Sequence, residues 1–69
     1  MINLDAYYHD YLHTDKCFNI DGVCEHVVAY GWTDDGSRID GYYVLTNNYK
    51  LYYNLEEKFL HKESVNIGV

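Results

Sequence analysis

Three short segments rich in glycine, aspartate and asparagine divide the middle of the chain into runs of β-branched and aromatic residues. The dividing segments are Asp21-Gly22, Asp34-Asp35-Gly36-Ser37 and Asn47-Asn48. Such runs, separated by residues that favour tight turns, are typical of successive β-hairpins. They predict strands at about residues 16–20, 23–33, 38–46 and 49–55.

A helix is predicted before these strands and a fifth strand after them. Residues 3–14 carry apolar side chains at the spacing of one helical face, with Asn3 as the N-cap. Residues 59–67 alternate as a strand does, although Asn54 followed by Glu56-Glu57 also fits the start of a short helix. We favour the strand because it would complete a meander. The predicted fold is α+β: one domain, residues 1–69, with an N-terminal helix packed on a four- to five-stranded antiparallel β-meander.

Strand periodicity assigns the residues of this sheet to two faces. In the run at 23–33, the bulkier set is assigned to the core, namely Cys24, His26, Val28, Tyr30 and Trp32. In the run at 38–46, the more apolar set is assigned to the core, namely Ile39, Tyr43 and Leu45. The opposite face would then expose Glu25, Asp40 and Tyr42. Gly31, inside a strand, indicates a bulge or the close approach of another backbone.

The chain is short and acidic, with 69 residues and a formal net charge of -6. This charge disfavours direct binding to nucleic acid or to anionic membranes, which both select for lysine and arginine. No apolar run approaches the roughly 18 residues of a membrane span, and residues 1–5 lack the features of a signal peptide. We therefore expect a cytoplasmic protein with free thiols, located in the host cell if a phage encodes it.

Two histidines and two cysteines have a spacing that suggests a metal site, and they are His9, His13, Cys17 and Cys24. Histidines four residues apart on a helix present their rings on one side, and two cysteines with two histidines can hold zinc. Familiar zinc sites space their cysteines more closely, so zinc is an alternative and no cofactor is predicted. A Cys17–Cys24 disulfide is another alternative. A two-residue Asp21-Gly22 loop would place the cysteines diagonally, whereas a four-residue loop would place them opposite one another.

The residue types favour recognition over catalysis. Cys24 and His26 resemble a nucleophile and base, but nothing supplies an orienting third group, so we expect no enzymatic activity. Nine tyrosines exceed what a small core can hide, and tyrosine is enriched at protein interfaces. The pairs Tyr42-Tyr43 and Tyr52-Tyr53 must each place one ring on either face of the sheet. The predicted partner-binding residues are Tyr42, Asp40, Glu25, Tyr52, Asp34 and Asp35.

These features predict a small acidic protein-interaction module that covers a basic, nucleic-acid-binding surface of a larger protein. Residues with A/T-rich codons are common, which is typical of many bacteria, phages and other viruses, and a phage-type inhibitor of host or defence machinery would look like this chain. One alternative is a homodimer or other small structural protein stabilised by zinc or a disulfide. A second alternative is single-strand nucleic-acid binding through a row of tyrosines.

Overall fold

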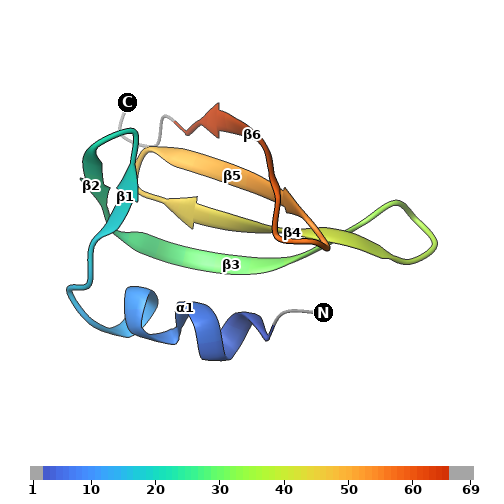
Figure 1. The fold of residues 1–69 in the computed structure, drawn as a ribbon, viewed down its shortest axis with the longest axis horizontal. Helices are drawn as coiled ribbons and strands as arrows, with labels where there is room; N and C mark the ends of the chain where they lie inside the picture. The colour runs from blue at the N-terminus through green and yellow to red at the C-terminus, as the bar shows by residue number, and fades with distance from the viewer. Residues whose placement is uncertain (1–2, 66–69) are drawn as a thin grey trace.

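The structure, a computed structural model, describes residues 3–65, which form one helix followed by six strands (Figure 1). The elements are α1 (Leu4–His13), β1 (Phe18–Ile20), β2 (Val23–Glu25), β3 (Val27–Asp34), β4 (Ile39–Thr46), β5 (Tyr49–Asn54) and β6 (Phe59–Ser64). Strands β3 to β6 form an antiparallel meander, and β1 and β2 form a separate two-stranded sheet. The α+β prediction is confirmed, with the first hairpin detached from the main sheet.

Helix α1 begins where the sequence predicts and packs along β3 (Figure 1). The Asn3 side chain accepts a hydrogen bond from the backbone N of Ala6 at 3.1 Å, which is the expected N-cap. Leu4 and Tyr8 bury their side chains against the sheet. The Tyr30 hydroxyl donates to Asp5 Oδ1 at 2.8 Å and ties the helix to β3.

The predicted strand at 23–33 is interrupted at His26, which lies between β2 and β3. A register shift between Val27 and Ala29 then adds one residue to β3 and reverses the alternation of its side chains. Because of this bulge, Glu25 and Val27 are buried, and Cys24, His26 and Val28 are exposed. The predicted core face was therefore wrong before the bulge, whereas Tyr30 and Trp32 beyond it do face the core side.

The face assignment for β4 was also wrong. Tyr42 is 2% exposed and lies in the core with Val44, whereas Ile39 is exposed and Tyr43 is half-buried. The cause is tertiary: β3, β4 and β5 align Trp32, Tyr42 and Tyr53 in one cross-strand row, and the Tyr8 ring packs 6.3 Å from that of Tyr42. We call the side of the sheet that meets α1 the inner face and the opposite side the outer face.

The C-terminal segment forms the predicted strand. Strand β6 pairs with β5 in antiparallel register, with Leu51 opposite Lys62 and Tyr52 opposite His61. Glu57, at a φ of 67°, lies in the connection between them. Residues 66 and 67 of the predicted strand lie outside the described residues.

Four tyrosines on or against the inner face have a raised pKa, and at Tyr30 the main cause is its hydrogen bond to Asp5. Burial is the main cause for Tyr8, Tyr42 and Tyr53, and the electrostatic influence of Tyr42 further raises the pKa of Tyr8 and Tyr53. The rings of Tyr42 and Tyr53 stack with centroids 5.0 Å apart. Folding therefore favours the neutral phenols over the phenolates.

This arrangement predicts unfolding at high pH. A tyrosine whose folded pKa lies above its unfolded value of about 10 stabilises the fold fully below that pH and loses this contribution as the pH rises further. The free energy of unfolding should stay level to about pH 9 and then fall by up to about 1.4 kcal/mol per pH unit for each of Tyr8, Tyr42 and Tyr53. Urea titrations across this range, with phenolate absorbance as a second signal, would measure it. A level free energy up to about pH 11 would contradict the buried tyrosines.

Candidate functional site

The outer face of the main sheet carries an aromatic row that crosses three strands. The register places Tyr43 of β4 beside Tyr52 of β5, and Tyr52 beside His61 of β6. The rings of Tyr52 and His61 stack with centroids 4.5 Å apart, and Lys50 Nζ lies 4.7 Å from the Tyr43 ring centroid. We call Tyr43, Tyr52 and His61 the outer aromatic row. Their side chains are half-buried or exposed, so the row is accessible.

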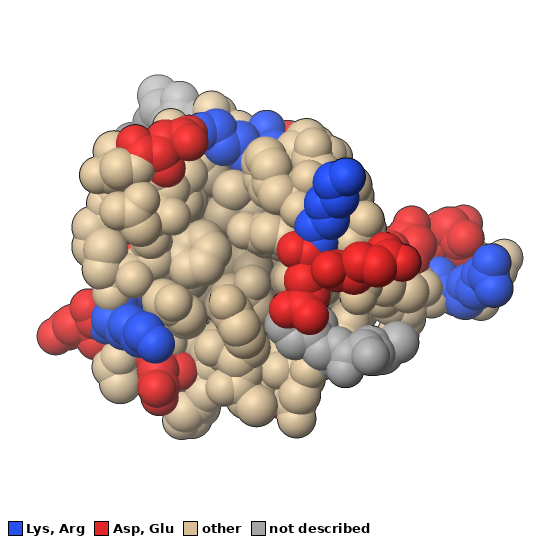
Figure 2. Space-filling view, viewed as in Figure 1, with Lys and Arg blue, Asp and Glu red and all other residues tan. Residues whose placement is uncertain are grey.

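Acidic residues gather at one end of the meander, although they are spread along the sequence. The β3–β4 and β5–β6 connections lie at the same end of the meander because Gly41 pairs with Asn54. Five of the eleven acidic residues lie in or next to these connections, namely Asp34, Asp35, Asp40, Glu56 and Glu57. We call this set the acidic end. Figure 2 shows acidic side chains, with basic ones beside them, on the side of the molecule where these turns lie. The basic residues of the two connections are Arg38 and Lys58.

A hollow of about 230 Å³ joins the acidic end to the outer aromatic row. Three of the predicted partner-binding residues line it together, namely Asp34, Asp40 and Tyr52. The rest of its wall is formed by Thr33, Tyr53, Leu60 and His61. The Thr33 hydroxyl donates to Asp40 Oδ1 at 2.8 Å and holds that carboxylate beside the hollow. The hollow thus combines two carboxylates with an aromatic wall, and we call it the outer hollow.

Asp35, another predicted partner-binding residue, is exposed but serves the turn itself. Its Oδ1 accepts hydrogen bonds from the backbone N of Ser37 at 2.9 Å and of Arg38 at 3.1 Å. These bonds lower the pKa of Asp35, because they stabilise its ionised form. The carboxylate therefore stays charged while it orders the β3–β4 turn.

Tyr42 and Glu25 were assigned to the exposed face, and that placement is wrong. Tyr42 lies in the core, and Glu25 is 6% exposed beneath the β4–β5 turn. Glu25 Oε1 accepts from Asn48 Nδ2 at 3.0 Å and lies 3.2 Å from the Thr46 hydroxyl. Hydrogen bonds satisfy the buried carboxylate, so it ties β2 to the main sheet and offers little surface to a partner.

The residues of the predicted metal set are divided in the structure. Cys17 and Cys24 form a disulfide with Cα atoms 5.3 Å apart, so the expectation of free thiols is wrong. The hairpin has the two-residue loop, yet the chain before β1 still brings Cys17 against Cys24. His9 and His13 lie side by side on α1 with ring centroids 4.6 Å apart. In residues 3–65, no three histidine, cysteine or acidic side chains gather as a metal site.

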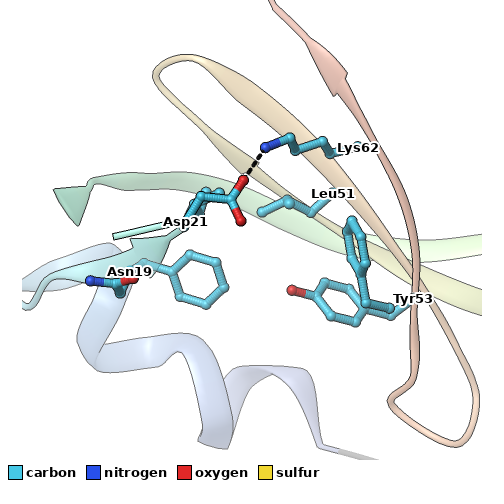
Figure 3. A pocket seen from close by; sticks show the side chains of 8 residues that line it. Asn19, Asp21, Leu51, Tyr53 and Lys62 are labelled. Carbon is cyan, nitrogen blue, oxygen red and sulfur yellow. Dashed lines mark hydrogen bonds and ion pairs between the residues drawn. The ribbon is translucent and has the colours of Figure 1, made fainter. Parts of the chain in front are cut away.

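A second hollow, of about 330 Å³, lies on the inner face and was not predicted (Figure 3). Most of its lining residues are apolar or aromatic, namely Phe18, Ile20, Leu51, Tyr53 and Phe59, and the others are Asn19, Asp21 and Lys62. Figure 2 shows an uncharged hollow near the centre of this view, with charged side chains around it. The hollow arises where the β1–β2 hairpin meets β5 and β6, so alternation within single strands cannot reveal it.

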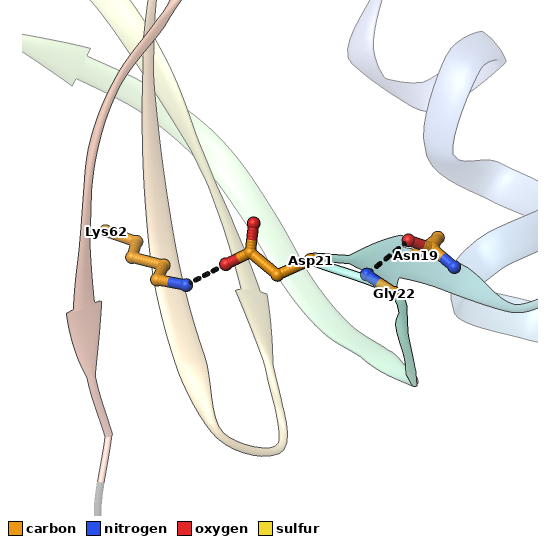
Figure 4. A network of polar contacts seen from close by, with 4 residues as sticks. All are labelled: Asn19, Asp21, Gly22 and Lys62. Carbon is orange, nitrogen blue, oxygen red and sulfur yellow. Dashed lines mark hydrogen bonds and ion pairs between the residues drawn. The ribbon is translucent and has the colours of Figure 1, made fainter.

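An ion pair closes one side of this inner hollow (Figure 4). Lys62 Nζ on β6 donates to Asp21 Oδ2 at the tip of the β1–β2 hairpin, which raises the pKa of Lys62. Asp21 has a φ of 53°, and Gly22 donates its backbone N–H to Asn19 Oδ1 at 3.0 Å. The turn thereby fixes the carboxylate that anchors the hairpin to β6.

No protein family, curated protein or solved structure matches this chain. No helix of the described residues has the length and apolar character needed to cross a membrane.

Proposed function

We propose that this chain is a small, non-catalytic protein-interaction module that covers a basic surface of a larger protein. The observation that carries this proposal is the outer hollow, where Asp34 and Asp40 stand beside Tyr52 and His61. Aromatic side chains provide large, rigid contact area, and carboxylates around them favour a partner of opposite charge. The net charge of -6 extends this preference over the whole molecule.

A basic surface of this kind is typical of proteins that bind nucleic acid. The chain would then act by occlusion, as a phage-type inhibitor of a host or defence protein. Direct binding of single strands through the outer aromatic row is less favoured, because basic residues are scarce beside it. The parts of β4 to β6 that the row crosses, residues 41–45, 50–54 and 59–63, contain two lysines, Lys50 and Lys62, and Lys62 points to the inner face. We place the protein in the cytoplasm, although the Cys17–Cys24 disulfide is more typical of oxidising compartments.

Neutralising the carboxylates of the outer hollow should weaken partner binding. We expect Asp34→Asn with Asp40→Asn to reduce the association rate about tenfold at low salt and less at high salt, because the lost term is long-range attraction. The matched control is Asp10→Asn with Asp15→Asn, which changes the net charge equally at exposed positions away from the hollow. The partner would first be captured from the native host, and kinetics would then be measured at about 0.05 and 0.3 M salt.

The captured protein must also lose nucleic-acid binding when this chain is added. Equal effects of the two double variants would show that only total charge matters and would overturn the assignment to the outer hollow. Tyr52→Ala gives a second check, since a central aromatic contact should contribute about 2 kcal/mol or more to binding.

A further inference from the structure

Strand β6 is the edge of the main sheet, and its outward backbone groups can be identified. All six of its residues are exposed, and among the strands of residues 3–65 it pairs with β5 alone. Val65 donates its backbone N–H to Asn48 O at 2.8 Å on the β5 side. Because backbone groups alternate in direction along an antiparallel strand, Lys62 and Ser64 point their N–H and C=O groups away from β5. These groups could pair with another strand.

The inner hollow lies beside this edge. Phe59 and Lys62 belong to both β6 and the hollow lining, and Phe59 is 49% exposed. A strand added to β6 would place alternate side chains on the inner face, next to Phe59, where an apolar side chain can lean into the hollow. The charge of Lys62 is already compensated by Asp21, so this side favours an apolar neighbour.

The other side of the same strand favours a basic neighbour. Glu63 points to the outer face with its side chain 59% exposed, accepts from the Tyr52 hydroxyl at 3.4 Å and lies 3.9 Å from His61 Nε2. Lys50 of β5 stands opposite Glu63, but its Nζ lies over the Tyr43 and Tyr52 rings. We infer that β6 and the inner hollow form a second binding surface, which takes an extended segment of a partner protein in which apolar and basic residues alternate. Main-chain hydrogen bonds to Lys62 and Ser64 supply affinity, and the hollow and Glu63 supply selectivity.

A second copy of this chain fits the edge less well. A two-fold antiparallel pairing centred on Lys62 or Glu63 would set like charges opposite one another. A pairing centred on His61 would set Phe59 opposite Glu63. The alternating basic segment avoids both conflicts.

The probe is a short blocked peptide in which valine and lysine alternate, added to isotope-labelled protein and followed by NMR. We expect slowed amide exchange at Lys62 and Ser64, with shifted methyl signals of Ile20 and Leu51 in the hollow. A peptide in which glutamate replaces lysine should bind at least about tenfold more weakly. Ser64→Pro removes one outward N–H and should weaken binding about tenfold, while Ser64→Ala retains that N–H and should bind as the wild type does.

Phe59→Ala tests the hollow independently of the backbone and should also weaken the peptide severalfold. Three results would each overturn the inference: equal binding of Ser64→Pro and Ser64→Ala in folded protein, signal changes confined to the outer aromatic row, or the same amide changes on raising the protein concentration without peptide. The last would assign the edge to a second copy. This inference goes beyond the proposed function. Its surface meets the outer aromatic row at His61 of β6, but the groups that bind the partner, which are the backbone of Lys62 and Ser64, the inner hollow and Glu63, do not include Asp34, Asp40 or Tyr52. Its failure would leave the effect of the Asp34 and Asp40 variants unchanged.

Discussion

Replacing Tyr8 by alanine should leave most of the protein unfolded at room temperature. The Tyr8 side chain is 3% exposed and joins the helix to both sheets. Its ring centroid lies 4.7–6.3 Å from those of five others, Tyr7, Tyr11, Phe18, Tyr30 and Tyr42. Truncating a buried aromatic side chain costs about 3–5 kcal/mol, which is comparable to the whole stability that a core of this size supplies.

Tyr7 provides the matched control, because it is adjacent in sequence, on the same helix, and 55% exposed. Tyr7→Ala should cost less than about 1 kcal/mol. Tyr8→Phe retains the ring and should keep the protein folded. Urea titrations followed by circular dichroism would rank the three variants. Similar losses for Tyr7→Ala and Tyr8→Ala would mean that α1 does not pack on the sheet through Tyr8.

The parts of the fold that depend on local chemistry could be predicted from the sequence. Asn3 caps the helix with its own side chain, and Asp21-Gly22 forms its turn through positive φ angles at both residues. The alternation after residue 58 correctly indicated β6. In each case a few neighbouring residues determine the backbone, so no knowledge of distant contacts is required.

The two faces of the sheet could not be assigned correctly in this way. One extra residue in β3 reverses every side chain on one side of the bulge, and no composition signal marks Val28 as that residue. In β4, polarity favoured the Ile39 set for the core, but packing against Tyr8 selects Tyr42. The pattern of apolar residues within one strand takes no account of the helix that packs against it.

Only the part of the candidate site that depends on neighbouring strands could be predicted from the sequence. Asp34 and Asp40 flank one turn, so their proximity follows from the hairpin, and Tyr52 joins them through the β4–β5 register. The inner hollow depends on how a detached hairpin docks through Asp21 and Lys62, residues 41 positions apart. Local pattern carries no information about that contact.

Gly41→Ala should destabilise the protein strongly, although strand interiors usually favour alanine over glycine. Alanine normally stabilises a strand interior relative to glycine, by about 0.5–1 kcal/mol. At Gly41, however, an added Cβ would stand 2.2 Å from the carbonyl oxygen of Tyr53, and backbone cannot move aside as a side chain can. We expect a loss of about 3 kcal/mol, at the upper end of the cost of overpacking.

Gly31→Ala is the comparison that isolates this effect. The sequence singled out Gly31 for a bulge or a close backbone approach, but the bulge lies at Val28, and an added Cβ at Gly31 would meet the Tyr43 ring at 2.8 Å. That ring can swing away, so Gly31→Ala should cost about 1 kcal/mol or less. Thermal and urea unfolding of both variants would test the difference. If Gly41→Ala were as stable as the wild type, the pairing of Gly41 with Asn54 would be wrong, and so would the register that aligns Tyr43 with Tyr52 in the outer aromatic row.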